Sequence, residues 1–130
     1  MGIHEIRILM VVSMVLCLTS AVHAAQGNAV FYTSTDTPAC SQEHNKGTMI
    51  AGVSDELWGN GAACGRRYRV QCIGGANEAP HPCRSGASVE VTVVDYCRQP
   101  CNGVLNLYRD AFAQIADLDA GKVRVEYNQI

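Results

Sequence analysis

The chain has 130 residues, of which 17% are charged and 48% are hydrophobic, and its formal net charge is −2. This length fits one domain, and the composition excludes a disordered, highly charged chain. A slightly acidic protein has no basic surface that could follow a phosphate backbone, so we expect no nucleic-acid partner. The 7 cysteines are the feature that most needs an explanation.

The first residues of the chain have the features of a secretory signal peptide. Arg7 precedes an apolar run over residues 8–18, and a Val-His-Ala sequence ends at Ala24. The run is shorter than the roughly 20 apolar residues that cross a bilayer, so it does not predict a membrane anchor. We therefore expect residues 1–24 to be a cleaved signal peptide, and residues 25–130 to be one domain in the extracellular space without membrane insertion.

Cleavage would remove Cys17 and leave an even set of cysteines. In an oxidising compartment such a set predicts a disulfide framework, because a small domain gains stability from cross-links. Zinc sites usually carry paired Cys-x-x-Cys spacings, which this set lacks, and the remaining imidazoles are those of His44 and His81, so we expect neither metal nor cofactor. Spacing alone leaves the pairing open. The remaining cysteines are Cys40, Cys64, Cys72, Cys83, Cys97 and Cys101.

The first half of the expected domain contains a strand, a long loop, an apolar segment and a short helix, in that order. Apolar and aromatic residues at 29–32 predict a strand, and the polar residues 33–48 predict a loop. An apolar segment over residues 49–53 then leads to a short helix over residues 55–58. Ser54 is placed to cap this helix.

The second half of the expected domain predicts four more strands. Polar and apolar residues alternate at 67–72 and at 122–127, and the valines of residues 89–94 make the strongest strand prediction. A short strand at 105–107 precedes a helix at 109–116. Many short strands with two small helices favour a compact β-barrel over a helical bundle or a doubly wound sheet.

Four strings in the chain, taken in order, resemble one family. They are Ala-Val-Phe-Tyr at 29–32, Leu-Trp-Gly-Asn-Gly-Ala-Ala-Cys-Gly-Arg-Arg-Tyr-Arg-Val-Gln-Cys at 57–72, Val-Glu-Val-Thr-Val-Val-Asp-Tyr-Cys at 89–97 and Leu-Tyr-Arg-Asp-Ala-Phe-Ala-Gln-Ile-Ala at 107–116. The chain resembles the expansin-like, family-45-endoglucanase-like domain, and most closely the plant natriuretic peptide group of EG45-like domain-containing proteins. This resemblance implies a mainly β fold, a six-stranded double-psi β-barrel with short helices.

The resemblance also implies a disulfide pairing. Arg67 stands where expansins carry another cysteine, so that expansin bridge is absent from this chain. The pairs implied by the expansin pattern are Cys40 with Cys64, Cys72 with Cys83 and, by what remains, Cys97 with Cys101.

The residues do not support a hydrolase. A glycosidase of this family needs two carboxylates, one as general acid and one as general base. The family's acid is an aspartate, but this chain has Asn106 there, and an amide does not titrate in the required range. Asp95 matches a family aspartate, but it has no evident carboxylate partner, and we interpret it as a hydrogen-bonding residue at a strand end. We therefore expect no catalytic residue.

A groove that binds wall polysaccharide weakly is compatible with the same residues. The candidates to line it are Tyr32, Asp95 and Asn106. The other tyrosines and Trp58 could also stack on sugars, although we interpret Trp58 as a packing residue.

The resemblance to plant natriuretic peptides implies a secreted, systemically mobile signalling protein that acts in the apoplast, and we expect it to be a monomer. In that group a plasma-membrane receptor and a rise in cyclic GMP act on water and solute balance, and the activity is associated with the segment corresponding to residues 40–72. Arg66, Arg67 and Arg69 form a local positive cluster there, able to pair with receptor carboxylates. The alternative for the cluster is a solvated strand face. Signalling is the main function expected, and a polysaccharide-binding module without hydrolase activity is the alternative.

Overall fold

The computed structural model describes residues 24–34, 36–41 and 46–130. The predicted signal peptide, with Cys17, lies outside the described residues except for Ala24, and so does His44. In the described part of the chain, no helix is long and apolar enough to cross a membrane.

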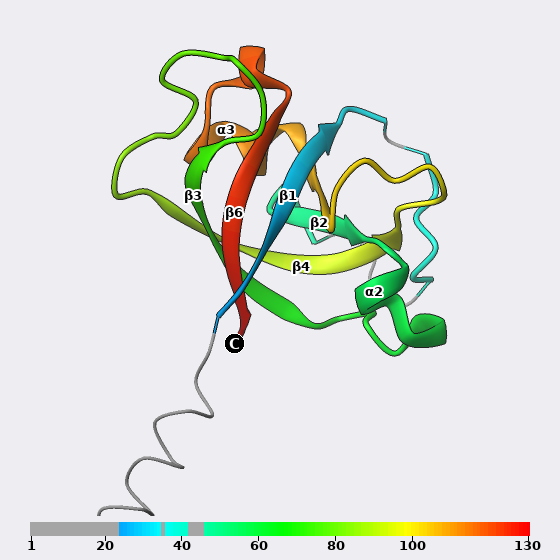
Figure 1. Cartoon of the computed structure of the whole chain (residues 1–130). Coiled ribbons are helices and arrows are strands. Elements are labelled where there is room, and N and C mark those ends of the chain that lie inside the picture. The colour runs from blue at the N-terminus through cyan, green and yellow to red at the C-terminus, as the bar shows by residue number, and fades with distance from the viewer. Residues whose placement is uncertain (1–23, 35, 42–45) are drawn as a thin grey trace, which may run out of the picture.

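The described strands form a closed barrel in the order β1-β5-β2-β4-β3-β6. Figure 1 labels β1, β2, β3, β4 and β6. The pairs β1/β5 and β2/β4 are parallel, and the other four pairs are antiparallel. Every strand expected from the sequence is present, although β1 begins before residue 29. The strands are β1 (Ala25–Tyr32), β2 (Ile50–Val53), β3 (Arg67–Gly75), β4 (Ser88–Tyr96), β5 (Leu105–Tyr108) and β6 (Lys122–Gln129).

The barrel core is built by alternation along the strands. Over most of β3 and β6, and in β4 up to Val93, every second residue is buried, because successive side chains point to opposite faces of a strand. In β4 the alternation ends there, since Val94 is buried as well. The helix α3 (Arg109–Ile115) packs against β1, β3, β4 and β5 and contributes Phe112, which is fully buried. Its ring lies 5.0 Å from that of Phe31, measured between centroids. The predicted helix at 109–116 therefore completes the core.

A short helix, α2 (Asp55–Trp58), follows β2 and lies outside the barrel (Figure 1). Ser54 occupies its N-cap position as expected, but its side chain makes no capping hydrogen bond. Instead the Ser54 carbonyl accepts hydrogen bonds from the backbone N–H groups of Leu57 and Trp58. The helix ends at Gly59, whose positive φ of 57° suits a residue without a Cβ atom.

Three disulfides hold the loops to the barrel. The first bridge ties the loop after β1 to the segment before β3, the second ties β3 to the loop that follows it, and the third closes the loop between β4 and β5. The pairs are Cys40–Cys64, Cys72–Cys83 and Cys97–Cys101, the same pairs that the resemblance implies.

Candidate functional site

An open groove of about 950 Å³ lies where β1, β4 and β5 end. Tyr32 ends β1 and Tyr108 ends β5, and the two residues are direct partners in the parallel pairing of these strands. Their rings meet edge to face, with centroids 5.4 Å apart. Tyr96, the last residue of β4, lines the same groove. The fold therefore gathers three tyrosines from three strand ends around one open cavity.

Tyr32 supplies a protonated hydroxyl to this groove. Burial, followed by the negative charge of Asp95 and the neighbouring Tyr108, raises the pKa of Tyr32 to about 12. A tyrosine with this pKa stays neutral across the physiological range and can donate a hydrogen bond to a ligand.

Asp95 lines the groove and also fixes its wall. Its Oδ1 accepts hydrogen bonds from the backbone N–H of Ala39, at 2.9 Å, and from that of Tyr96, at 2.8 Å. Ala39 precedes Cys40, whose own N–H donates to the Val94 carbonyl at 3.0 Å. The carboxylate thus joins the loop after β1 to the end of β4.

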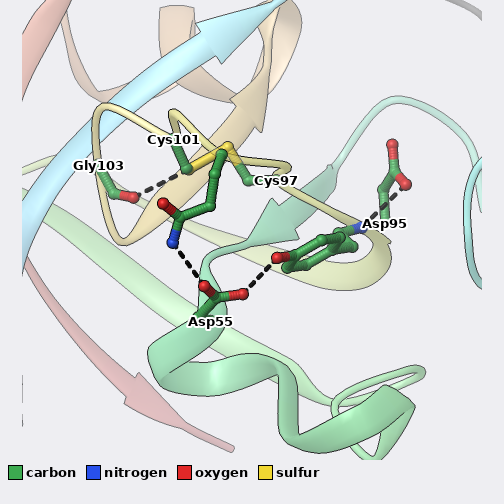
Figure 2. Close-up of a disulfide and its surroundings, with 7 residues drawn as sticks. Asp55, Asp95, Cys97, Cys101 and Gly103 are labelled. Carbon is green, nitrogen blue, oxygen red and sulfur yellow. Dashed lines mark hydrogen bonds between the residues drawn. A yellow bond between two sulfur atoms is a disulfide. The ribbon is translucent and has the colours of Figure 1, made fainter.

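Tyr96 is held by a second carboxylate from outside the groove. The Tyr96 hydroxyl donates to Asp55 Oδ1, and the Gln99 amide Nε2 donates to Asp55 Oδ2 at 2.6 Å, as the dashed lines in Figure 2 mark. The hydrogen bonds from Tyr96 and Gln99 lower the pKa of Asp55. The hydrogen bond to Asp55 in turn raises the pKa of Tyr96. The half-buried Trp58 packs on the Tyr96 ring, with centroids 5.2 Å apart, and also against the barrel core.

Asn106 does not line the groove, contrary to the expectation. It lies two residues before Tyr108 on β5, opposite Val30 of β1 and Gly52 of β2. Alternation gives Asn106 the same outward face as Tyr108, but the groove begins one pleat further along the strand, roughly 7 Å away. Gly52 also pairs with Asp95, so β2 separates Asn106 from Asp95 by two strand spacings, about 10 Å between backbones. The structure therefore brings Tyr32 and Asp95 together and leaves Asn106 apart.

The three arginines proposed for receptor binding lie elsewhere, and none of them lines the groove. Arg67 and Arg69 stand on β3 and share the carboxylate of Glu90 on β4, at 2.8 Å and 2.9 Å between nitrogen and oxygen. Their hydrogen bonds and charges lower the pKa of Glu90, that of Arg69 contributing most. Arg66 does not belong to this arrangement of Arg67, Arg69 and Glu90, and it is half-buried. The expected positive cluster is thus partly neutralised.

Sequence reasoning missed the partners that complete these arrangements. Arg69 and Glu90 are direct partners in the antiparallel β3/β4 pairing, so the alternation of both strands could have suggested the ion pair. Asp55 and Tyr96 are 41 residues apart, and no local pattern indicates that they meet. The sequence alone indicates only that Tyr96 and Tyr108 are aromatic residues able to stack on sugars.

A second, smaller groove of about 570 Å³ lies beside the Cys97–Cys101 loop. The start of β1, the first turn of α2 and this loop line it, and Asp55 and Gln99 are among its residues. The loop packs closely on β1: a Cβ atom added at Gly103 would lie 2.7 Å from the Asn28 carbonyl oxygen, too close for any residue but glycine. Within the described ranges no group of three or more His, Cys, Asp or Glu residues could hold a metal ion.

Comparison with known proteins places these features in a family. Residues 50–127 match the family described as Lytic transglycolase. An EG45-like domain containing protein from Citrus jambhiri is 45% identical over 126 residues, covering 95% of both chains. EG45-like domain containing protein 2 from Arabidopsis thaliana is 50% identical over 113 residues, covering 87% of this chain and 86% of its own. Expansin-A25 from Oryza sativa is 28% identical, over 97% of this chain and 60% of its own.

A solved structure supports the same placement at the level of the fold. The expansin of Clavibacter michiganensis, crystallised as a mutant in complex with cellohexaose, superposes with a TM-score of 0.58 at 24% identity. The match covers 82% of this chain, which spans half of the bacterial protein. This likeness confirms the predicted double-psi form of the six-stranded barrel. The chain belongs to the EG45-like domain-containing proteins and is built on an expansin-like double-psi β-barrel.

Proposed function

We propose that this chain is a secreted, non-hydrolytic module that binds a β-1,4-glucan of the plant cell wall in the 950 Å³ groove. The observation that carries the proposal is the set of three tyrosines, Tyr32, Tyr96 and Tyr108, around one open cavity. Aromatic side chains suit a sugar because the ring packs on its C–H faces, and a tyrosine hydroxyl that faces the groove can also bond to sugar hydroxyls. The Tyr96 hydroxyl already donates to Asp55, so Tyr96 offers its ring. A bacterial expansin with the same fold has been crystallised with cellohexaose, which supports the choice of ligand.

The charges around the groove favour a neutral polymer. Asp36 and Asp95 line it together with Lys46 and Arg98, so acidic and basic side chains are balanced among the lining residues that the structure describes. A polyanion would need an excess of positive charge, which the described lining residues do not supply. The protonated hydroxyl of Tyr32 adds a donor without adding charge. An uncharged glucan therefore fits these side chains better than an acidic polysaccharide does.

Binding of cellohexaose by isothermal titration calorimetry tests the proposal. We expect Tyr108→Ala to weaken binding about five- to tenfold, since it removes one aromatic contact, while Tyr108→Phe keeps most of the affinity. Ile73→Ala is the control, because Ile73 is an exposed apolar residue, 42% accessible, outside the groove. Thermal unfolding of each variant checks that the fold is intact. A wild-type protein that binds neither cellohexaose nor insoluble cellulose would remove the proposal.

Secretion to the apoplast is part of the proposal and is supported by the signal-peptide features of residues 1–24. We propose that the protein acts there as a monomer. The expected mature protein begins at Ala25, the first residue of β1. Amino-terminal sequencing of protein recovered from the culture medium of plant cells checks this site.

A signalling role in water and solute balance, through a plasma-membrane receptor and cyclic GMP, is the second candidate. The observation that favours it is the Cys40–Cys64 bridge, which preorganises the segment before β3 that carries Arg66. The sharing of Glu90 by Arg67 and Arg69 counts against it, because their charges are already partnered. Binding of labelled protein to plant plasma-membrane vesicles, compared between wild type and Arg66→Gln, separates this role from glucan binding.

A further inference from the structure

Asp55 reaches the glucan groove only through another residue. It is the first residue of α2, and it lines the smaller groove rather than the larger one. One oxygen of its carboxylate accepts from Tyr96, a residue of the larger groove, and the other accepts from Gln99, a residue of the smaller groove. The carboxylate therefore lies between the two cavities, beside the loop that the Cys97–Cys101 disulfide closes (Figure 2).

Three contacts restrain Tyr96, and each acts on a different part of the residue. Asp95 accepts from its backbone N–H, Trp58 packs on its ring, and Asp55 accepts from its hydroxyl. The first two contacts act on the backbone and on the ring, and neither involves the hydroxyl at the far end of the side chain. The third contact fixes this end, so Tyr96, a residue that lines the groove, is ordered before any ligand arrives.

Holding the ring in advance has an energetic effect on binding. A side chain that is ordered only in the complex loses rotamer freedom at that moment, which weakens the observed affinity. A side chain that is already ordered avoids this loss. The gain is largest for a flat aromatic contact, because its geometry depends on the orientation of the ring.

We propose that Asp55 is a positioning residue for glucan binding: it holds the Tyr96 hydroxyl outside the groove so that the Tyr96 ring faces the sugar. The inference rests on the proposed function and names a residue that does not itself line the binding groove. Gln99 supports Asp55 by donating to its second oxygen from the disulfide-closed loop.

A double-mutant cycle with cellohexaose as the probe tests the inference. We expect Asp55→Ala to weaken binding about fivefold, the effect of losing one such hydrogen bond. Tyr96→Phe, which keeps the ring and loses the hydroxyl, should weaken binding by the same factor. The double variant should lose no more than either single one, because both changes remove the same contact. Glu56→Ala is the matched control, with the same loss of charge at the next residue of α2, and should bind as wild type.

Two spectroscopic readouts follow the Tyr96 side chain without a ligand. The alkaline absorbance titration should show the pKa of Tyr96 falling towards its usual range in Asp55→Ala but not in Glu56→Ala, because Asp55 holds it up. Trp58 is the only tryptophan in the sequence and packs on Tyr96, so its fluorescence should change in Asp55→Ala. Asp55→Asn, which keeps an acceptor for the hydroxyl, should restore part of the affinity.

The possible results separate this inference from the proposed function. A wild-type protein that does not bind cellohexaose overturns both. A wild-type protein that binds, together with an Asp55→Ala variant of unchanged affinity, overturns the inference alone. Additive losses in the double variant would also overturn it, since they would mean that the Tyr96 hydroxyl contacts the sugar directly. An unchanged Tyr96 titration in Asp55→Ala would show that the hydrogen bond does not hold the side chain.

Discussion

Asn106 and Asp95 decide what chemistry the outer face of the barrel can perform. Hydrolysis of a glycosidic bond by the usual route needs a carboxylic acid to protonate the leaving oxygen and a carboxylate on the other face of the sugar. Asn106 offers an amide, and Asp95 uses one oxygen to accept two backbone hydrogen bonds. Among the described residues that line the larger groove there is one further carboxylate, that of Asp36, which is exposed on the loop after β1. Asp95, engaged in two backbone hydrogen bonds, can orient a loop or a ligand but cannot supply both catalytic roles.

We therefore expect the purified protein to release no reducing ends from soluble cellulose. A commercial cellulase assayed in parallel shows that the substrate and the detection work. Release of reducing ends that Asp95→Asn abolishes would contradict this expectation and would make Asp95 a catalytic residue.

At the scale of elements, the pairing of β3 with β4 places one acid between two bases. Arg67 and Arg69 lie on the same exposed face of β3, and Glu90 lies opposite Arg69 on β4. The three side chains are about half exposed, with accessible fractions of 54%, 51% and 44%, so solvent screens their interaction and its contribution to stability is small. The arrangement nonetheless favours the native register of the two strands, because a slip by one residue would separate the charges.

We expect Glu90→Gln to lower the free energy of unfolding slightly at neutral pH. The folded-state pKa of Glu90 lies below its usual value of 4.5, so its contribution is present above that value and is lost as the pH falls through the folded-state pKa. Urea unfolding of wild type and variant should therefore differ at neutral pH and converge in acid. Glu78→Gln, in the loop after β3, is the control. A difference that persists in strong acid would rule out the ion pair as its cause.

The elements that the sequence predicted well are those whose pattern is local. The alternation at 67–72 and 122–127 and the valines at 89–94 became β3, β6 and β4, because half-buried strands need that pattern. The first residues of β1, Ala25 to Asn28, have no such pattern and are a strand only because they pair with β6. The groove could be predicted only in part for the same reason: Tyr32 and Asp95 were found as motif residues, whereas the Asp55–Tyr96 contact depends on tertiary packing.

At the scale of the whole molecule, the disulfides close loops of very different length. Cys40–Cys64 spans 24 residues and Cys97–Cys101 spans 4. In the chain-entropy description the longer loop restricts the unfolded chain more, so the first bridge contributes about 3.5 kcal/mol and the last about 2 kcal/mol. The long bridge therefore serves mainly stability, while the short one also orders the loop that carries Gln99.

Paired replacement of cysteines by serine checks this division. We expect the Cys40→Ser/Cys64→Ser variant to lose about 1.5 kcal/mol more unfolding free energy than the Cys97→Ser/Cys101→Ser variant. The second variant should lose affinity for cellohexaose beyond its loss of stability, because Gln99 is released from Asp55. Urea unfolding and calorimetry measure the two effects separately. Equal losses of stability in both variants would contradict the loop-length argument.

The neighbours of β1 in the closed barrel also set the order in which the protein can fold during its synthesis. The strand β1 pairs with β5 and β6, and both of these come from residues 105–129. When β1 leaves the ribosome, every strand that will hydrogen-bond to it is still to be made. The barrel can therefore close only after β5 and β6 have been made, whereas β3 and β4, which are consecutive and antiparallel, can pair before then.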